Sequence, residues 1–294
     1  MGKEDERMII IDCNYICHKI KFALINAPLS VEGFKTEIIF GFLRQLLVVA
    51  QEFPKEKTWV FTWDSRVNNR KVMYPDYKKK RLEKKTREEK ELESIVYDQF
   101  TELRLFTLPS MGFKNIFIQK GYEADDIIAS IVMLESYDKN KIIVSSDQDL
   151  YQLLPYESSI FDVKKKSLYT KKDFEQEYEI ESHRWAVIKA YAGCSSDNIK
   201  GIEGVGEKTA IKYLNNQLKN TTMARQKIES KEGKEIFNRN FPLVRLPLEG
   251  TNSFPIGLDR LTKKDFSDTF EKYRLNSFLQ RKTWDNWETF FDLQ

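Results

Sequence analysis

Carboxylate side chains that could bind a metal ion recur along the sequence, each group following a short apolar run. The runs span residues 8–11, 59–63, 116–118 and 142–144. The acids that follow these runs are Asp12, Asp64, Glu123, Asp125, Asp126, Asp147 and Asp149. Hard oxygen ligands with no histidine among them favour Mg²⁺ or Mn²⁺ over zinc. The pattern therefore predicts an all-oxygen metal site.

A turn or a helix cap is the commoner explanation for one aspartate after a strand. It does not explain four such groups, two of which contain paired acids. Carboxylates packed together raise each other's pKa and destabilise a fold unless cations neutralise them. The apolar spacing after Glu123 is helical, so Glu123, Asp125 and Asp126 should lie in or next to a first helical turn, where the helix dipole favours carboxylates.

The elements that position these acids follow from the spacing of the apolar runs. Each run has the length of a buried strand, and helical patterns separate the runs. This alternation predicts an α/β fold with a parallel sheet and helices on both faces. Ligands bind at the carboxyl ends of the strands in such sheets, so the acids should meet at one edge. The apolar stretch 38–50 is too short to span a bilayer and predicts a buried amphipathic helix.

A basic segment, residues 66–93, follows Asp64. Its cations are Arg66, Arg70, Lys71, Lys78, Lys79, Lys80, Arg81, Lys84, Lys85, Arg87 and Lys90. A mixed Lys/Glu stretch is usually a solvated helix. Here the cations are densest before the acidic residues begin, and Tyr74 and Tyr77 lie among them. Cations can bind phosphates and aromatic rings can stack on unpaired bases, so the segment is predicted to arch over the acidic edge.

A glycine-rich connection between two predicted helices forms a second candidate nucleic-acid contact. Gly201, Gly204 and Gly206 punctuate it, and Lys208 and Thr209 begin the following helix. Glycine allows the backbone to approach a phosphate closely, and a helix N-terminus supplies amide donors. The segment predicts sequence-independent binding of duplex through backbone contacts.

Four short motifs of the sequence are GYEADD, SSDQDL, YPDYKKKR and SDNIKGIEGVGEKTA. They resemble those of the flap endonuclease / 5′→3′ exonuclease family, which includes the 5′ nuclease domain of bacterial DNA polymerase I and stand-alone bacteriophage enzymes. The resemblance runs from about residue 8 to residue 214. It implies a PIN-like α/β catalytic domain over residues 1–180 with a helical arch over about 66–93. It also implies a helical DNA-binding domain over 181–294 with a helix–three-turn–helix element over about 185–215.

The resemblance also implies roles for individual residues. Asp197 joins the seven acids named above as a ligand of two Mg²⁺ ions, which Mn²⁺ can replace. Lys78 and Arg81 are implied to steady the scissile phosphate, Tyr77 to stack on a base, and Arg70 to contact DNA on the same approach. The DNA-binding positions in the hairpin are Gly201, Gly204, Gly206, Lys208 and Thr209, and the family holds a K⁺ ion there.

The implied function is hydrolysis of phosphodiesters in branched, nicked or 5′-overhang DNA by two-metal catalysis, as a structure-specific 5′ flap endonuclease and 5′→3′ exonuclease. RNA–DNA hybrids and RNA-primer removal in replication or repair fit the same family. A monomer in a bacterial or phage-infected host cytoplasm is expected, with replication proteins as candidate partners. The polar N-terminus lacks the apolar core of a signal peptide, so a membrane partner is not expected.

One position departs from the family pattern. Cys194 stands three residues before Asp197, where the family usually has an aspartate. This departure motivates a first alternative, a non-catalytic or weakened homologue that binds branched DNA. A second alternative is a metal-dependent ribonuclease of the same α/β class, which would lack the glycine-rich hairpin. The other cysteines, Cys13 and Cys17, are expected to be buried thiols, and His18 and His183 lie outside the motifs.

The remaining sequence carries less information. The 294 residues allow one or two domains, and a charged fraction of 32% accompanies a net charge of only +3. Aromatic residues recur at roughly helical intervals over 264–294. They predict terminal helices that pack back onto the body, with a partner-binding tail as the alternative.

Overall fold

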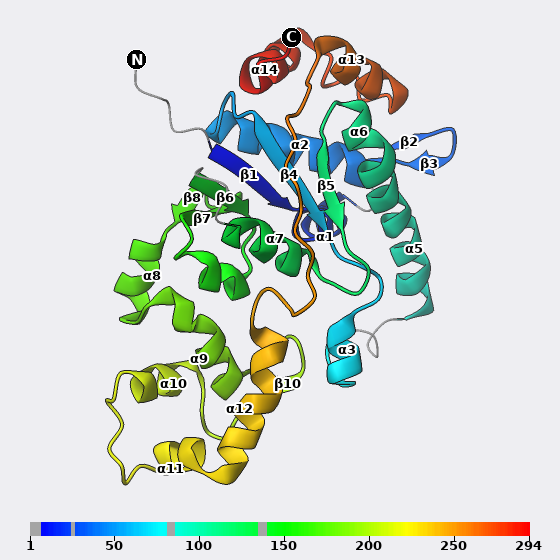
Figure 1. Ribbon diagram of the computed structural model, residues 1–294. Coiled ribbons are helices and arrows are strands. Elements are labelled where there is room, and N and C mark those ends of the chain that lie inside the picture. Colours follow the sequence, from blue (N-terminus) through cyan, green and yellow to red (C-terminus); the bar gives the residue numbers. More distant parts are fainter. Residues whose placement is uncertain (1–6, 25–26, 81–85, 135–139) are drawn as a thin grey trace, which may run out of the picture.

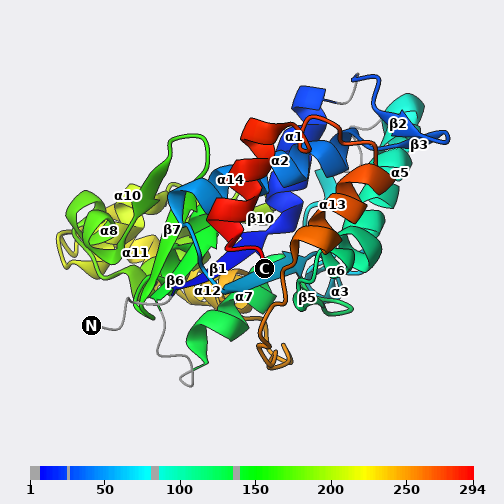
Figure 2. The ribbon, with the colours of Figure 1, turned by 90° about the horizontal axis from the view of Figure 1, so that it is seen from above.

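The computed structural model describes residues 7–24, 27–80, 86–134 and 140–294. Arg81 lies outside these residues. A six-stranded sheet forms the centre of the larger part of the molecule, and a group of helices extends from one end of it (Figures 1 and 2). The sheet has the order β5-β4-β1-β6-β7-β8. Its strands are β1 (Arg7–Asp12), β4 (Thr58–Trp63), β5 (Asn115–Ile118), β6 (Asn140–Val144), β7 (Ser158–Asp162) and β8 (Ser167–Tyr169).

All neighbouring strands are parallel except β7 and β8. This confirms the α/β fold and the four strands expected from the sequence, to which the structure adds β7 and β8. Strand β1 lies between β4 and β6, so the chain crosses from one side of β1 to the other after β5. Such a reversal opens a crevice at the carboxyl ends of the central strands. The acids at the ends of β1 and β4 therefore face this crevice.

Alternation along the central strands gives the sheet two buried faces. In β1, Ile9 and Ile11 belong to one apolar cluster, whereas Met8 and Ile10 belong to the other. The first cluster is covered by helices from the N-terminal half and by the C-terminal helices. These are α1 (Cys13–Leu24), α2 (Glu37–Glu52), α5 (Arg87–Glu102), the π-helical turn Leu103–Thr107, α6 (Leu108–Ser110), α13 (Lys263–Lys272) and α14 (Arg281–Phe291). Helix α2 confirms the amphipathic helix expected over 38–50.

The second face is covered by α7 (Ala124–Met133) and by the elements that follow β6. Those elements are the 3-10 helix η2 (Gln148–Leu153), α8 (Lys171–Tyr178), η3 (Ser182–Arg184), α9 (Trp185–Ala192), α10 (Glu207–Leu214), α11 (Met223–Glu229) and α12 (Lys231–Val244). Short elements complete the fold: β2 (Ser30–Val31), β3 (Phe34–Lys35), α3 (Asn69–Met73), β9 (Gly193–Cys194) and β10 (Ile199–Lys200). Figure 1 shows that α9 to α12 form the end of the molecule remote from α13 and α14.

The C-terminal segment returns to the sheet. Asp259 accepts backbone N–H bonds from Trp59 at 2.9 Å and from Lys114 at 2.8 Å, which fixes the returning chain beside β4 and β5. The rings of Phe266, Phe270 and Trp287 are buried against the first apolar cluster. Residues 263–294 therefore pack back onto the body, as expected. They lie with the sheet rather than with the helices of 185–244, whereas the sequence placed all of 181–294 in one domain.

Within the described part of the chain, no helix combines the length and apolar character needed to cross a membrane.

Candidate active site

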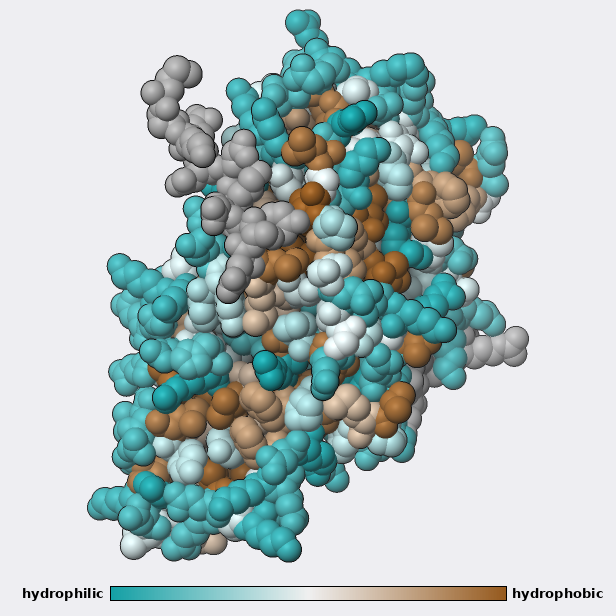
Figure 3. Space-filling view, in the orientation of Figure 1, coloured by the Kyte–Doolittle hydropathy of each residue, from teal (hydrophilic) through white to brown (hydrophobic). Residues whose placement is uncertain are grey.

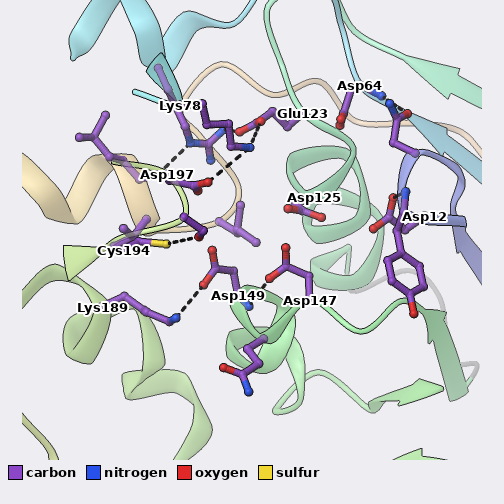
Figure 4. Close-up of a pocket in the computed structure, with 18 of the residues that line it drawn as sticks. Asp12, Asp64, Lys78, Glu123, Asp125, Asp147, Asp149, Lys189, Cys194 and Asp197 are labelled. Atoms are coloured by element: carbon purple, nitrogen blue, oxygen red, sulfur yellow. Dashed lines mark hydrogen bonds and ion pairs between the residues drawn. The ribbon is translucent and has the colours of Figure 1, made fainter. Parts of the chain in front are cut away.

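The carboxyl edge of the sheet contains a cavity of about 450 Å³. Six of its acids come from strand ends and adjoining helical turns, and one, Asp197, comes from the segment that follows α9 (Figure 4). The predicted metal ligands that line the cavity are Asp12, Asp64, Glu123, Asp125, Asp147, Asp149 and Asp197. The carboxylates of Asp125, Asp147 and Asp149 point into the cavity from one side, and those of Asp12 and Asp64 lie beside them. The structure thus brings together seven of the eight acids expected to bind metal.

Hydrogen bonds from the surrounding chain fix the direction of each carboxylate. Asp12 accepts from the Tyr15 backbone N–H and from the Ser145 hydroxyl, both at 3.0 Å. Asp64 accepts at 2.7 Å from the N–H of Ala124, the first residue of α7. The two bonds to Asp12 go to different oxygens, Oδ1 and Oδ2, and the bond to Asp64 goes to its Oδ1. The carboxylates are therefore held in place before any ligand binds.

The edge beyond β6 is fixed in a similar way. Asp147 is the N-cap of η2, and its side chain accepts the Asp149 backbone N–H at 2.8 Å. The Ser145 hydroxyl also accepts the Asp147 N–H at 3.2 Å. The turn after β6 therefore places two aspartates on the same side of the cavity.

Mutual repulsion and burial make the ionised state of this cluster unfavourable. Burial, and then repulsion by Asp64, raises the pKa of Asp12 to about 7. Burial, and then Glu123, raises the pKa of Asp64 to about 6. Burial and the neighbouring Asp147 raise the pKa of Asp125 well above its usual range. Burial and Asp147 also raise the pKa of Asp149 to about 6.

A divalent cation fits this arrangement. Carboxylates with raised pKa values around a cavity lose their repulsion when a cation of opposite charge binds between them. The oxygen donors of Asp12, Asp64, Asp125 and Asp147 are the type that Mg²⁺ and Mn²⁺ accept. The donor chemistry of the pocket therefore favours divalent metal binding.

Glu123 differs from the other acids because cations surround it. Lys78 donates to its Oε1, and the hydroxyl of Tyr77 donates to its Oε2 at 2.7 Å. Burial alone would raise the pKa of Glu123, but Lys78 and Arg70 lower it to about 2. Lys78 also lies 3.9 Å from Oδ1 of Asp197. The lysine expected to meet phosphate is thus held at the cavity by two carboxylates.

Arg70 and Asp126 form a buried ion pair, of which Arg70 lines the cavity and Asp126 does not. Asp126 is completely buried and does not line the cavity, and both of its carboxylate oxygens contact Arg70 at 2.6 and 2.7 Å. Asp126 also accepts from the backbone N–H groups of Glu123 and Leu248. Arg70 is 2% exposed and donates its Nε–H to the Leu243 carbonyl at 2.8 Å. This ion pair joins α3, α7 and α12 at the wall of the cavity.

Tyr77 is also enclosed. Its side chain is 2% exposed and packs in a small apolar cluster with Ala190, Cys194 and Leu243. In this position the ring contacts other side chains of the protein. The sequence had led us to expect a ring that is open to stack on a base. The Tyr77 hydroxyl instead orients Glu123.

Lys189 is a cavity residue that the sequence reasoning missed. Its Nζ lies 3.4 Å from Oδ1 of Asp149 and 3.0 Å from Oε1 of Glu207. Its ammonium also lies over the Trp185 ring, 5.2 Å from the centroid. A signal was present, because Lys189 is the only charged residue in the apolar helix WAVIKAYA. Figure 4 shows it approaching Asp149 from the side opposite Lys78.

The glycine-rich hairpin continues directly from the cavity. Gly193 and Gly201 sit where β9 and β10 cross the end of α9. A Cβ at Gly201 would lie 2.2 Å from the backbone carbon and oxygen of Ala192. Gly204 adopts a φ of +79°, and Gly206 is the N-cap of α10, whose first turn contains Lys208 and Thr209. Helices α9 and α10 and the tight connection between them lie within residues 185–215, where the helix–three-turn–helix element was expected.

The comparisons with known proteins agree with this geometry. The family model described as 5′-3′ exonuclease, N-terminal resolvase-like domain, matches residues 7–179. The 5′-3′ exonuclease of Aquifex aeolicus is 32% identical over 210 residues, which are 70% of this chain and 68% of that protein. DNA polymerase I of Deinococcus radiodurans is 32% identical over 71% of this chain, which corresponds to 21% of the polymerase.

A solved structure extends the likeness to the whole fold. The T5 5′-exonuclease with bound zinc has a TM-score of 0.68 at 22% identity and covers 97% of this chain and 99% of its own. This likeness includes the helical C-terminal region, which lies beyond the residues 7–179 that the family model matches. The structural likeness confirms the fold, and the sequence matches confirm the family suggested by the motifs. The chain belongs to the 5′-3′ exonuclease family.

Proposed function

We propose that this 5′-3′ exonuclease hydrolyses phosphodiesters near the 5′ end of branched or nicked DNA, with Mg²⁺ as its cofactor. The observation that carries the proposal is the cavity itself. It combines aspartates whose pKa values are raised with two lysines, Lys78 and Lys189, at its rim. Carboxylates suit cations and lysines suit phosphate oxygens, so the cavity can receive both at once.

The acids of the cavity divide between two cation positions in this proposal. Asp12, Asp64, Asp125 and Asp147 would hold one ion, and Asp149 and Asp197 would contribute to the other. Bound divalent ions lower the pKa of a water molecule and offset charge on the leaving oxygen. The chain's own hydrogen bonds, such as Ser145 to Asp12, keep the carboxylates oriented for this task.

Lys78 is the residue placed to contact the phosphate. Its side chain is 22% exposed, so the ammonium faces both Glu123 and the open part of the cavity. Burial alone would lower the pKa of Lys78, but Glu123 and then Asp197 raise it, so the amine stays charged. A fixed positive charge at this point would stabilise negative charge that develops on the phosphate. Arg81 is proposed to act beside it as part of the arch.

Duplex binding is assigned to the hairpin and the surface beyond it. Gly204, Gly206 and Lys208 are exposed, and α10 starts at the end of the hairpin. Figure 3 shows mainly hydrophilic side chains around this end of the molecule. Backbone amides and lysines there would contact phosphates without reading sequence, with K⁺ bound in the hairpin. Binding should therefore weaken steeply as salt concentration rises.

Cleavage of a labelled 5′-flap substrate tests the proposal. The protein is incubated with Mg²⁺ or with EDTA, and single-stranded and blunt duplex DNA serve as substrate controls. Metal-dependent cutting near the junction is the expected result. Tight binding of the flap without cutting, in either Mg²⁺ or Mn²⁺, would instead support the non-catalytic reading that Cys194 motivates. An RNA-containing 5′ strand in the same assay tests the hybrid substrate.

Substitutions of Gly201 and Gly206 should have different effects on stability and on DNA binding. Gly201→Ala should destabilise the fold by about 1–3 kcal/mol, because its Cβ would overlap the Ala192 backbone. Gly206→Ala is the matched control for packing, since nothing lies within 4 Å of the added carbon. Its stability should change by at most about 1 kcal/mol, while duplex affinity falls. Urea denaturation and fluorescence anisotropy with duplex DNA measure the two effects. Equal stability of both variants would contradict the packing argument.

Cys194 gives a prediction about metal dependence. Cys194→Asp adds a carboxylate next to Asp149 and Asp197, so half-maximal cleavage should need at least about tenfold less Mg²⁺. Cleavage rate as a function of Mg²⁺ concentration is the measurement, with Cys17→Ser as a control at a buried thiol that does not line the cavity. An unchanged Mg²⁺ requirement would show that another group already fills this position.

A further inference from the structure

A sulfur atom lies among carboxylates at the hairpin end of the cavity. The side chains of Asp149, Cys194 and Asp197 each offer a ligand atom, and these atoms all lie within 4.8 Å of one another. Cys194 is 8% exposed and Asp197 is 9% exposed. Figure 4 shows the three side chains converging between Lys78 and Lys189. The group is small enough to surround one divalent ion.

The hairpin holds two of these ligands at a fixed spacing. Cys194 in β9 pairs with Ile199 in β10, and the Asp197 backbone N–H donates to the Cys194 carbonyl at 3.3 Å. The Asp197 carbonyl in turn accepts the Lys78 backbone N–H at 2.8 Å. The sulfur and the carboxylate are therefore brought together by the turn itself, and the turn is tied to the base of the arch.

Ligand chemistry separates this group from the rest of the cavity. Mg²⁺ binds oxygen donors and keeps several of its waters, whereas zinc, cadmium and cobalt ions accept thiolate sulfur. Both carboxylates of the group are shared with lysines: Asp149 with Lys189 at 3.4 Å and Asp197 with Lys78 at 3.9 Å. These lysines weaken the attraction for a hard ion that is bound by charge alone. A thiolate adds a third anionic ligand when the incoming metal displaces its proton.

We propose that Asp149, Cys194 and Asp197 form a divalent site that prefers zinc-class, sulfur-binding ions over Mg²⁺. The two cation positions of the cavity then differ in metal preference, one with oxygen ligands and one with mixed oxygen and sulfur ligands. The proposal rests on the proposed function only in placing a second cation in this cavity. Its chemistry depends on the replacement of a carboxylate by a thiol at residue 194.

Cadmium titration of the 294-residue protein tests this site without any nuclease assay. Ultraviolet absorption from sulfur-to-cadmium charge transfer reports whether the ion contacts sulfur. Cys194→Ser is the matched variant, because it removes only the sulfur, and Cys194→Asp restores an oxygen ligand. We expect the absorption band in the wild type and its loss in Cys194→Ser, with at least about tenfold weaker Cd²⁺ binding in that variant.

A competition with Mg²⁺ completes the experiment. A large excess of Mg²⁺ should leave the wild-type cadmium band unchanged, and Mg²⁺ should compete with Cd²⁺ more effectively in Cys194→Asp. Circular dichroism checks that each variant is folded. A band that persists in folded Cys194→Ser would assign the sulfur to Cys13 or Cys17 and overturn the proposal, as would equal Cd²⁺ affinity in the two proteins. Failure of flap cleavage with the cadmium band present would refute the proposed function alone.

Discussion

Asp125→Asn should abolish cleavage and at the same time stabilise the metal-free protein. The carboxylate of Asp125 lies in the cavity with Asp12, Asp64 and Asp147. Burial and Asp147 raise its pKa well above the usual range, so its ionised form is unfavourable in the folded state. Removing the charge relieves repulsion, and we expect a gain of about 0.5–2 kcal/mol in the free energy of unfolding at pH 8 in EDTA. Cleavage should fall at least about 10²–10³-fold.

The stability of the metal-free protein should also depend on pH, because several aspartates of the cavity have raised pKa values. The pKa values of Asp12, Asp64 and Asp149 are about 7, 6 and 6 in the folded protein, against 3.8 for an ordinary aspartate. Between about pH 4 and pH 7 the folded state therefore binds more protons than the unfolded state. The metal-free wild type should lose stability as pH rises through this window. Mg²⁺ should restore stability at pH 8, because it binds the folded state.

Asp162→Asn is the matched control for this experiment. Asp162 also ends a strand, β7, but it lies outside the cavity lining. Its carboxylate accepts a hydrogen bond from the Lys164 backbone N–H at 2.8 Å. Urea denaturation across pH with and without Mg²⁺, together with flap cleavage, measures both effects. The control should keep wild-type cleavage and gain no stability. If Asp125→Asn were destabilised in EDTA at pH 8, the repulsion argument would be wrong.

The sequence predicted the acidic edge because strand periodicity alone determines where buried strands end. Asp12 and Asp64 follow apolar runs that form β1 and β4, and parallel strands must end at the same edge. Strands β7 and β8 were not predicted, since their short apolar runs lie in a polar segment. The sequence predicted that the C-terminal helices pack onto the body, but not which part of the body they cover. Aromatic spacing identifies a buried face but does not say which part of the molecule covers it.

Individual roles were harder to predict than the cluster. Asp126 was grouped with the metal ligands, although Glu123 and Asp126 have the spacing of a capping box. That spacing predicts a side chain that folds back on the helix start instead of facing the cavity. Whether Arg70 reaches Asp126 or DNA depends on the packing of α3 against α7 and α12, which are distant in sequence. No local pattern contains that information.

Arg70→Met should destabilise the protein by about 3–5 kcal/mol, because it leaves the completely buried carboxylate of Asp126 without its cation. The Leu243 carbonyl would also lose the donor from Arg70. Lys71→Met is the matched control, since Lys71 is the next residue in α3 and is exposed. Its stability should change by less than about 0.5 kcal/mol. Urea denaturation at pH 7 compares the three proteins.

A double variant separates the ion pair from simple loss of packing. Asp126→Asn removes the buried charge, so Arg70→Met combined with Asp126→Asn should be more stable than Arg70→Met alone. An Arg70 whose main contact were DNA phosphate would behave differently. Its loss would weaken DNA binding with little effect on unfolding, and Asp126→Asn would give no rescue. A small stability change in Arg70→Met would therefore return Arg70 to the DNA-binding role expected from the sequence, whereas a large change with partial rescue would show that Arg70 holds α3 against α7 and α12.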